Sequence, residues 1–227
     1  MNRSIEIVTP SPVRLEIAGV ALNADLSLPP DAAGLVVFAH GSGSSRHSSR
    51  NRAVADVFQQ AHLATLLLDL LTEHEEAVDV STAEFRFDIP LLADRVVGAI
   101  DWAQAHRPTA ALPLGVFGAS TGAAAALIAA ARRRQVVRAV VSRGGRADMA
   151  DDFLDVVSAP TLLIVGGLDE VVIQLNQDAL ARLKTTKDLQ IVAGATHLFE
   201  EPGALEQVAQ LSRDWFVRHL QSPAPRR

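Results

Sequence analysis

Short apolar runs recur along the chain and alternate with longer segments in which apolar residues follow a helical period. The strand-like runs lie at residues 35–39, 64–70, 113–118, 137–142, 161–165 and 189–192. Short runs with little internal charge are typical of strands that are buried on both faces of a parallel sheet. The segments between them predict helices at 50–62, 88–106, 120–134, 149–157, 173–184 and 202–220.

The first thirty residues have a different pattern. Residues 4–8, 13–20 and 21–28 read as three short strands, and the last two alternate apolar and polar positions around Gly19. Such alternation is typical of antiparallel strands. The whole pattern predicts an α/β fold with a mostly parallel sheet, helices on both faces and an antiparallel N-terminal edge. We expect one domain over residues 1–227, with 221–227 as a loose tail.

Composition and charge exclude several classes of protein. The chain has no Cys and no Tyr, so thiol nucleophiles, thiolate metal sites and mechanisms that need a phenol are excluded. The formal charge of −5 argues against nucleic acid and an anionic membrane as partners. We find no signal-peptide pattern and no metal-binding motif, and we expect a cytoplasmic protein without a cofactor or metal. Nothing in the composition predicts the oligomeric state.

The loop after the strand at 113–118 carries the first candidate chemistry. Gly118-Ala119-Ser120-Thr121-Gly122 is a G-x-S-x-G sequence between a predicted strand and a predicted helix. In a nucleophile elbow this turn is sharp, so a side chain two positions to either side of the serine would clash. The turn presents the hydroxyl at a helix N-terminus, where negative charge is stabilised. Taken alone, the motif also fits an ordinary turn of small residues.

Two later loops supply the groups that a serine nucleophile needs. Asp169 follows the strand at 161–165, and His197 follows the strand at 189–192. A serine hydroxyl attacks well when an imidazole takes its proton, and a carboxylate orients that imidazole. Ser120, Asp169 and His197 therefore predict a catalytic triad in the chain order of α/β hydrolases. Glu170 is the alternative acid.

The loop after the strand at 35–39 is the candidate oxyanion hole. It begins His40-Gly41-Ser42-Gly43, and its glycines allow backbone amides to approach a developing oxyanion. We assign the two donors to the amides of Ser42 and Thr121 and expect Gly41 to contact the substrate. We expect His40 to be a structural hinge of this loop rather than a base.

The chain resembles the α/β-hydrolase superfamily from about residue 13 to residue 220. It is similar to the dienelactone-hydrolase-like family, in particular to the domains that occur alone or joined to phosphoribosyltransferases. The stretches that carry the resemblance are HGSGSSRHSSRN (40–51), FGASTGAAAAL (117–127), VVSRGGRADMA (140–150), LLIVGGLDE (162–170) and GATHLFEEPGAL (194–205). The chain departs from true dienelactone hydrolases by having serine where those enzymes have cysteine, which puts dienelactone in doubt as a substrate.

Charged residues near these loops have two interpretations each. Arg143 either binds a substrate carboxylate or pairs with Asp148 or Asp151. Arg46, His47 and Arg52 flank the oxyanion loop and either hold it in place or contact an anionic substrate group; we favour the structural role. The side chains of Glu73, Glu75 and Glu76 are expected to form a solvated face.

The predicted function is a serine hydrolase that cleaves a carboxylic ester, thioester or lactone of a small acyl substrate through an acyl-enzyme. About 15 residues separate the strand at 137–142 from the next, which leaves no room for a large lid. Two alternatives remain: an acyltransferase that forms the same intermediate, and a binding domain without catalytic activity. A dehydrogenase of the short-chain kind is disfavoured, since its tyrosine base is missing.

Overall fold

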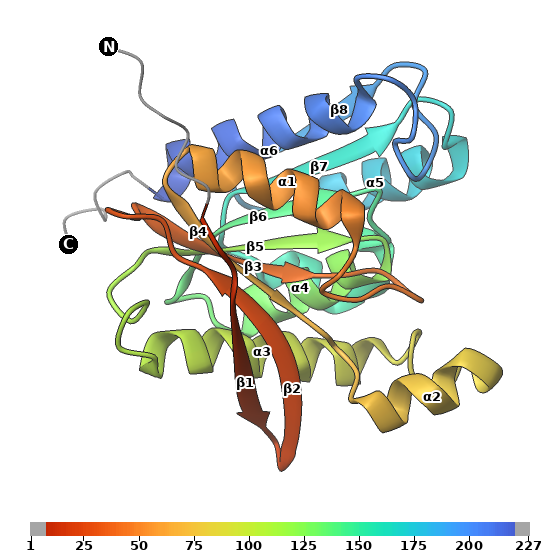
Figure 1. Ribbon diagram of the computed structural model, residues 1–227. Helices are drawn as coiled ribbons and strands as arrows, with labels where there is room; N and C mark the ends of the chain where they lie inside the picture. Colours follow the sequence, from red (N-terminus) through yellow and green to blue (C-terminus); the bar gives the residue numbers. More distant parts are fainter. Residues whose placement is uncertain (1–7, 221–227) are drawn as a thin grey trace.

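The computed structural model describes residues 8–220, which form an eight-stranded sheet with helices on both faces (Figure 1). The strand order is β1-β2-β4-β3-β5-β6-β7-β8. The strands are β1 (Ser11–Ile17), β2 (Val20–Ser27), β3 (Gly34–Ala39), β4 (Leu63–Leu68), β5 (Leu114–Ala119), β6 (Val137–Arg143), β7 (Thr161–Gly166) and β8 (Lys187–Val192). In this spatial order, neighbouring strands from β4 through β3 and β5 to β8 are parallel. The β1 and β2 strands form the antiparallel edge, and β2 pairs with β4 in the antiparallel direction.

The described helices are α1 (Ser49–Gln60), α2 (Glu73–Thr82), α3 (Ile89–Ala105), α4 (Thr121–Arg132), the 3₁₀ helix η1 (Ala147–Val156), α5 (Glu170–Arg182) and α6 (Ala204–Leu220). All of them except α2 belong to two layers that bury separate cores. The α1 and α6 helices cover one face, where Phe38, Phe58, Phe117 and Phe216 pack together (Figure 1). The helices α3, α4, α5 and η1 cover the other face.

The expected fold class is confirmed, and most predicted elements match within a few residues. The apolar runs correspond to strands because β3, β4, β5 and β7 are buried along their whole length. The expected strand at 4–8, apart from Val8, and the expected tail at 221–227 lie outside the described residues. Among residues 8–220, no helix is both long enough and apolar enough to cross a bilayer.

The helices differ from the expected pattern in two respects. The segment at 149–157 is a 3₁₀ helix, η1, with a kink at Asp151, where φ is 43°. The α2 helix was not predicted, because its sequence EHEEAVDVST has no apolar stripe and buries only Asp79. Thr72 and Glu75 form a capping box at its start, and this T-x-x-E spacing is the signal that could have revealed the helix.

Candidate active site

Ser120 occupies a strained turn between β5 and α4. Its φ is 50° and its ψ is −122°, a conformation that is costly for a residue with a side chain. The turn brings backbone segments into contact, so a Cβ at Gly118 would lie 2.5 Å from the Cα of Ala123, and one at Gly122 would lie 2.3 Å from the carbonyl oxygen of His40. The two glycines are thus required by close approach of the backbone, as the G-x-S-x-G pattern predicts.

The structure brings Ser120, His197 and Asp169 together at the carboxyl edge of the sheet. The His197 Nδ1 lies 2.6 Å from Asp169 Oδ2, and its Nε2 lies 3.4 Å from Ser120 Oγ. Because the carboxylate can only accept, Nδ1 carries the proton and Nε2 is left as the acceptor that faces the serine hydroxyl. The His197 side chain is 38% exposed, so the group is open to solvent.

Asp169, and not the alternative acid Glu170, contacts the imidazole. Asp169 precedes the first turn of α5, and its carboxylate is largely buried against His197. Glu170 is the first residue of α5 and is exposed. The sequence left both carboxylates open because they are adjacent in the same loop.

The loop after β3 passes directly over the nucleophile. A Cβ at Gly41 would lie 3.0 Å from the Ser120 Cβ, so this position borders the serine. The Ser42 hydroxyl donates to the carbonyl of Arg86 (3.2 Å) and lies 2.9 Å from Thr121 Oγ1. Since the single Ser42 hydroxyl proton is engaged by that carbonyl, Thr121 is the donor of the second bond. These bonds fix Ser42 beside Thr121, the pair whose amides are the expected oxyanion donors.

His40 is a structural residue of this loop, as expected. Its Nδ1 lies 2.9 Å from the Gly41 carbonyl oxygen, and its Nε2 accepts from the amide of Leu70 (3.0 Å). Burial lowers the pKa of His40, against smaller opposing effects of the Gly41 carbonyl and Asp69. Because both ring nitrogens are engaged, the imidazole is held neutral and is not free to act as a base.

The charged residues that flank the loop form a structural network, which confirms the favoured interpretation. Arg46 pairs with Asp69 at the end of β4, and it lies 3.7 Å from Asp25 on β2. Arg52 bonds to Asp25 (3.1 Å) and to the Nδ1 of His47 (2.7 Å). The loop is therefore tied to two strands of the sheet through partly buried ion pairs.

A link that was not predicted runs from α2 to the oxyanion loop. The buried Asp79 carboxylate accepts from the amides of Phe85 and Arg86 and from the Arg86 Nε. Burial by itself raises the pKa of Asp79, but these bonds and the Arg86 charge outweigh it and lower the pKa. The carbonyl of Arg86 in turn holds the Ser42 hydroxyl, so Asp79 positions the loop indirectly. The sequence pattern could not predict this link, because its contacts join segments that are separate along the chain.

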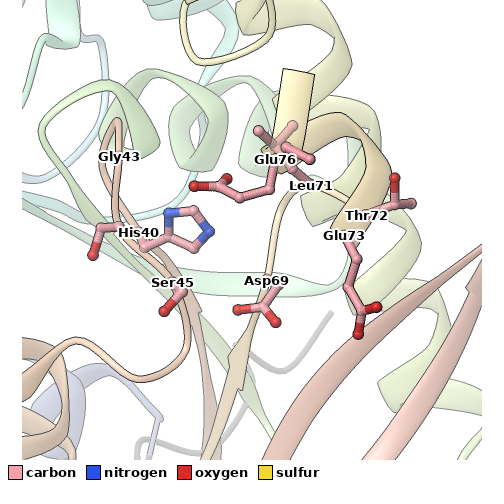
Figure 2. Close-up of a pocket in the computed structure, with 10 residues that line it drawn as sticks. His40, Gly43, Ser45, Asp69, Leu71, Thr72, Glu73 and Glu76 are labelled. Atoms are coloured by element: carbon pink, nitrogen blue, oxygen red, sulfur yellow. The ribbon is translucent and has the colours of Figure 1, made fainter. Parts of the chain in front are cut away.

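The expected solvated acidic face is correct only in part. Glu75 completes the capping box and also pairs with the buried Arg95 on α3 at 2.9 Å, so it is a structural residue. Glu73 and Glu76 instead line a cavity of about 460 Å³ beside His40 and Asp69, and Figure 2 shows the Glu76 carboxyl group extending towards the His40 ring. In the described part of the chain, this cavity is not lined by Ser120, His197 or Asp169.

The expected ion pair of Arg143 was wrong. Asp148 pairs with Arg146 (2.8 Å), and Asp151 pairs with Arg182 (3.3 Å). Arg143 ends β6, and its side chain is buried beside Asn51 at the start of α1. Neighbours in sequence suggested the pair, but η1 turns both aspartates away from the end of β6. Within residues 8–220, no three His, Asp or Glu side chains are arranged to hold a metal ion.

Comparison with known proteins decides the family. No family model matches the chain. A crystal structure named as a dienelactone hydrolase from Anabaena variabilis is 56% identical to it, with a TM-score of 0.93, and the match covers 94% of this chain and 99% of that one. The chain belongs to the dienelactone-hydrolase-like family of α/β hydrolases. This membership supports hydrolase activity.

More distant structures share the α/β-hydrolase fold of this chain. Est1E from Butyrivibrio proteoclasticus is 17% identical with a TM-score of 0.79, over 93% of this chain and 99% of that one. XC6422 from Xanthomonas campestris, described as a serine hydrolase without a lid, is 23% identical with a TM-score of 0.72, over 95% and 97% of the two chains. At this level of identity, the two structures support only the assignment of the fold.

The curated relatives of the chain carry another name. Two proteins from strains of Mycobacterium tuberculosis, each named "Putative phosphoribosyl transferase", are 55% identical to it over 227 residues. The match covers 98% of this chain and 50% of each of those proteins. The chain thus spans about half the length of the curated relatives that it matches, and their name describes the longer proteins.

Proposed function

We propose that the protein is a serine hydrolase that cleaves a carboxylic ester, thioester or lactone of a small acyl substrate. The observation that carries this proposal is the position of the His197 imidazole, whose two nitrogens face Asp169 and Ser120 at 2.6 Å and 3.4 Å. The longer of the two distances is compatible with catalysis, since such bonds commonly tighten when substrate binds.

In the proposed mechanism the Ser120 Oγ attacks the ester carbonyl while His197 Nε2 takes the hydroxyl proton. The resulting imidazolium is stabilised by Asp169 and returns the proton to the leaving alcohol, which departs from an acyl-serine. A water molecule activated by the same imidazole then attacks the acyl carbon and releases the acid and free Ser120. This sequence needs no cofactor.

The oxyanion of each tetrahedral intermediate would be held by the amides of Ser42 and Thr121. Among the described residues, neither amide is engaged by a protein acceptor. Thr121 begins α4, so the positive end of that helix adds to the stabilisation. Removing one such donor typically costs about 10²- to 10³-fold in kcat.

The proposal is tested by labelling with a fluorophosphonate probe, read by intact mass. We expect a single covalent adduct on the wild-type protein and none on Ser120→Ala. Ser142→Ala is the matched control, because Ser142 is a buried serine on the neighbouring strand and should leave labelling intact. The absence of an adduct on folded wild-type protein would overturn the proposal and favour a binding domain. If the adduct forms, product analysis with added alcohol separates hydrolysis from acyl transfer.

A further inference from the structure

Arg143 is a buried cation next to the proposed nucleophile. Its backbone carbonyl accepts from the Ser120 amide at 3.1 Å, so its side chain starts one strand away from the serine. The residue is 8% exposed. Burial, and to a smaller extent the nearby Arg50 charge, lower the pKa of Arg143 to about 10, which still leaves the guanidinium charged near neutral pH.

The Arg143 guanidinium has little to bind within the protein. Of its five N–H groups, those on Nη2 have one partner, the Asn51 Oδ1 at 3.5 Å, which is the limit of a hydrogen bond. The Nε and Nη1 atoms are buried, and no acceptor among the described residues reaches them. Buried charged groups are normally paired, and leaving one unpaired is costly. This arrangement therefore calls for an acceptor that the chain does not supply.

The surroundings of Arg143 add positive charge instead of compensating it. The α1 helix begins beside it, and the first turn of that helix contains Arg50 but no acidic residue. Arg52, in the same turn, is already paired with Asp25. The amide groups at a helix N-terminus themselves favour an anion. Arg50 also has a buried Nε without a partner, and its Nη1 contacts the exposed Glu200 at 3.2 Å.

Two of the acidic residues near the site lie away from Arg143. Glu73 and Glu76 line the cavity at the start of α2, together with His40 and residues 43–45 of the loop after β3 (Figure 2). Arg143 instead faces the start of α1, which follows that loop. An anionic group could therefore approach Arg143 without meeting these two carboxylates. The surroundings of Arg50 are mixed in charge, because its cavity of about 350 Å³ is also lined by Glu200, Glu201 and Glu206.

We propose that Arg143, with Arg50 and the start of α1, binds an oxyanion group of the substrate, so that the enzyme prefers esters that carry a carboxylate or phosphate close to the scissile bond. This proposal rests on the proposed function, because it places the anion relative to Ser120. Arg143 would be a specificity-determining residue: its charge-assisted hydrogen bonds would orient the ester towards the serine and the oxyanion donors.

The first test compares two esters of the same length, 4-nitrophenyl hydrogen glutarate and 4-nitrophenyl pentanoate. We expect wild-type kcat/KM to favour the charged ester by about ten-fold or more. In Arg143→Met the loss on the charged ester should exceed the loss on the neutral one by about ten- to hundred-fold, the range for a hydrogen bond to a charged group. Arg146→Met is the matched control, since Arg146 lies in the same segment but is paired with Asp148, and it should leave the preference unchanged.

The second test measures binding without turnover. Calorimetry on Ser120→Ala, with glutarate and inorganic phosphate as separate probes, shows which oxyanion binds, and we expect Arg143→Met in that background to abolish the binding. Equal losses on both esters, or unchanged binding, would overturn the proposal and leave a structural role. If Ser120 does not react with fluorophosphonate but the anion binds through Arg143, the proposed function fails and the anion site stands. If Arg143→Met does not fold, Arg50→Met tests the same cluster.

Discussion

At the scale of single residues, the two adjacent carboxylates at the end of β7 differ in what they touch. Asp169 bonds to the His197 Nδ1, whereas Glu170 is exposed at the start of α5. In Asp169→Asn the amide would favour the wrong imidazole tautomer, so we expect kcat to fall by about 10⁴-fold. In Glu170→Gln we expect a change within about two-fold. Steady-state kinetics on a short-chain ester, with unfolding curves for both variants, makes the comparison. Similar losses in the two variants would contradict the assigned roles.

The candidate site could be predicted where chemistry depends on order along the chain. Ser120, Asp169 and His197 each follow a strand of a parallel sheet, and the carboxyl ends of such strands meet at one edge. Which carboxylate bonds to the imidazole, and whether Arg143 has a partner, depend on side-chain directions over a few ångströms. Nearness in sequence suggested Asp148 and Asp151 for Arg143, but both are paired with other arginines.

At the scale of elements, α2 is the helix that the pattern did not reveal, and it contributes to the site from a distance. Its buried Asp79 holds Arg86, and the Arg86 carbonyl holds the hydroxyl of Ser42. A misplacement of about 1 Å in a catalytic group can cost as much as about 10²-fold in rate. The position of α2 is therefore relevant to catalysis although none of its residues belongs to the proposed triad.

We expect Asp79→Ala to lower kcat by about ten- to hundred-fold with a smaller change in KM, because the oxyanion loop would lose its anchor while the triad stays in place. Glu73→Ala, an exposed change at the start of the same helix, is the control and should leave kcat within about two-fold. Kinetics at saturating ester, together with fluorophosphonate labelling, distinguishes the two effects. An unchanged kcat in folded Asp79→Ala would show that the link does not position the loop.

At the scale of the whole molecule, the pattern predicted the layers because burial dictates them. The strands that are buried on both faces have unbroken apolar sequences, and the β1–β2 edge, with one face more exposed, alternates. The α2 helix, which is held by polar contacts, escaped prediction. The capping box and the Glu75–Arg95 ion pair fix it in place.

One such polar contact makes the stability of the fold depend on pH. Burial lowers the pKa of His40, so the folded protein keeps this imidazole neutral while an unfolded chain takes up a proton near pH 6.5. Between the unfolded and the folded pKa the unfolded state binds more protons, so stability must fall as the pH drops below about 6.5. Protonation would also remove the acceptor of the Leu70 amide. Burial lowers the pKa of His219 as well, which adds to the same trend.

The contribution of His40 can be isolated by measuring Tm at pH 7.5, 6.5 and 5.5. We expect the wild-type Tm to decrease across this range and His40→Gln to show a smaller decrease, since glutamine can accept from the Leu70 amide but does not titrate. His74→Gln, a change at an exposed position on α2, should follow the wild-type curve. Parallel curves for wild type and His40→Gln would mean that protonation of this imidazole is not coupled to unfolding. The acid sensitivity of the fold would then have to be sought at His219.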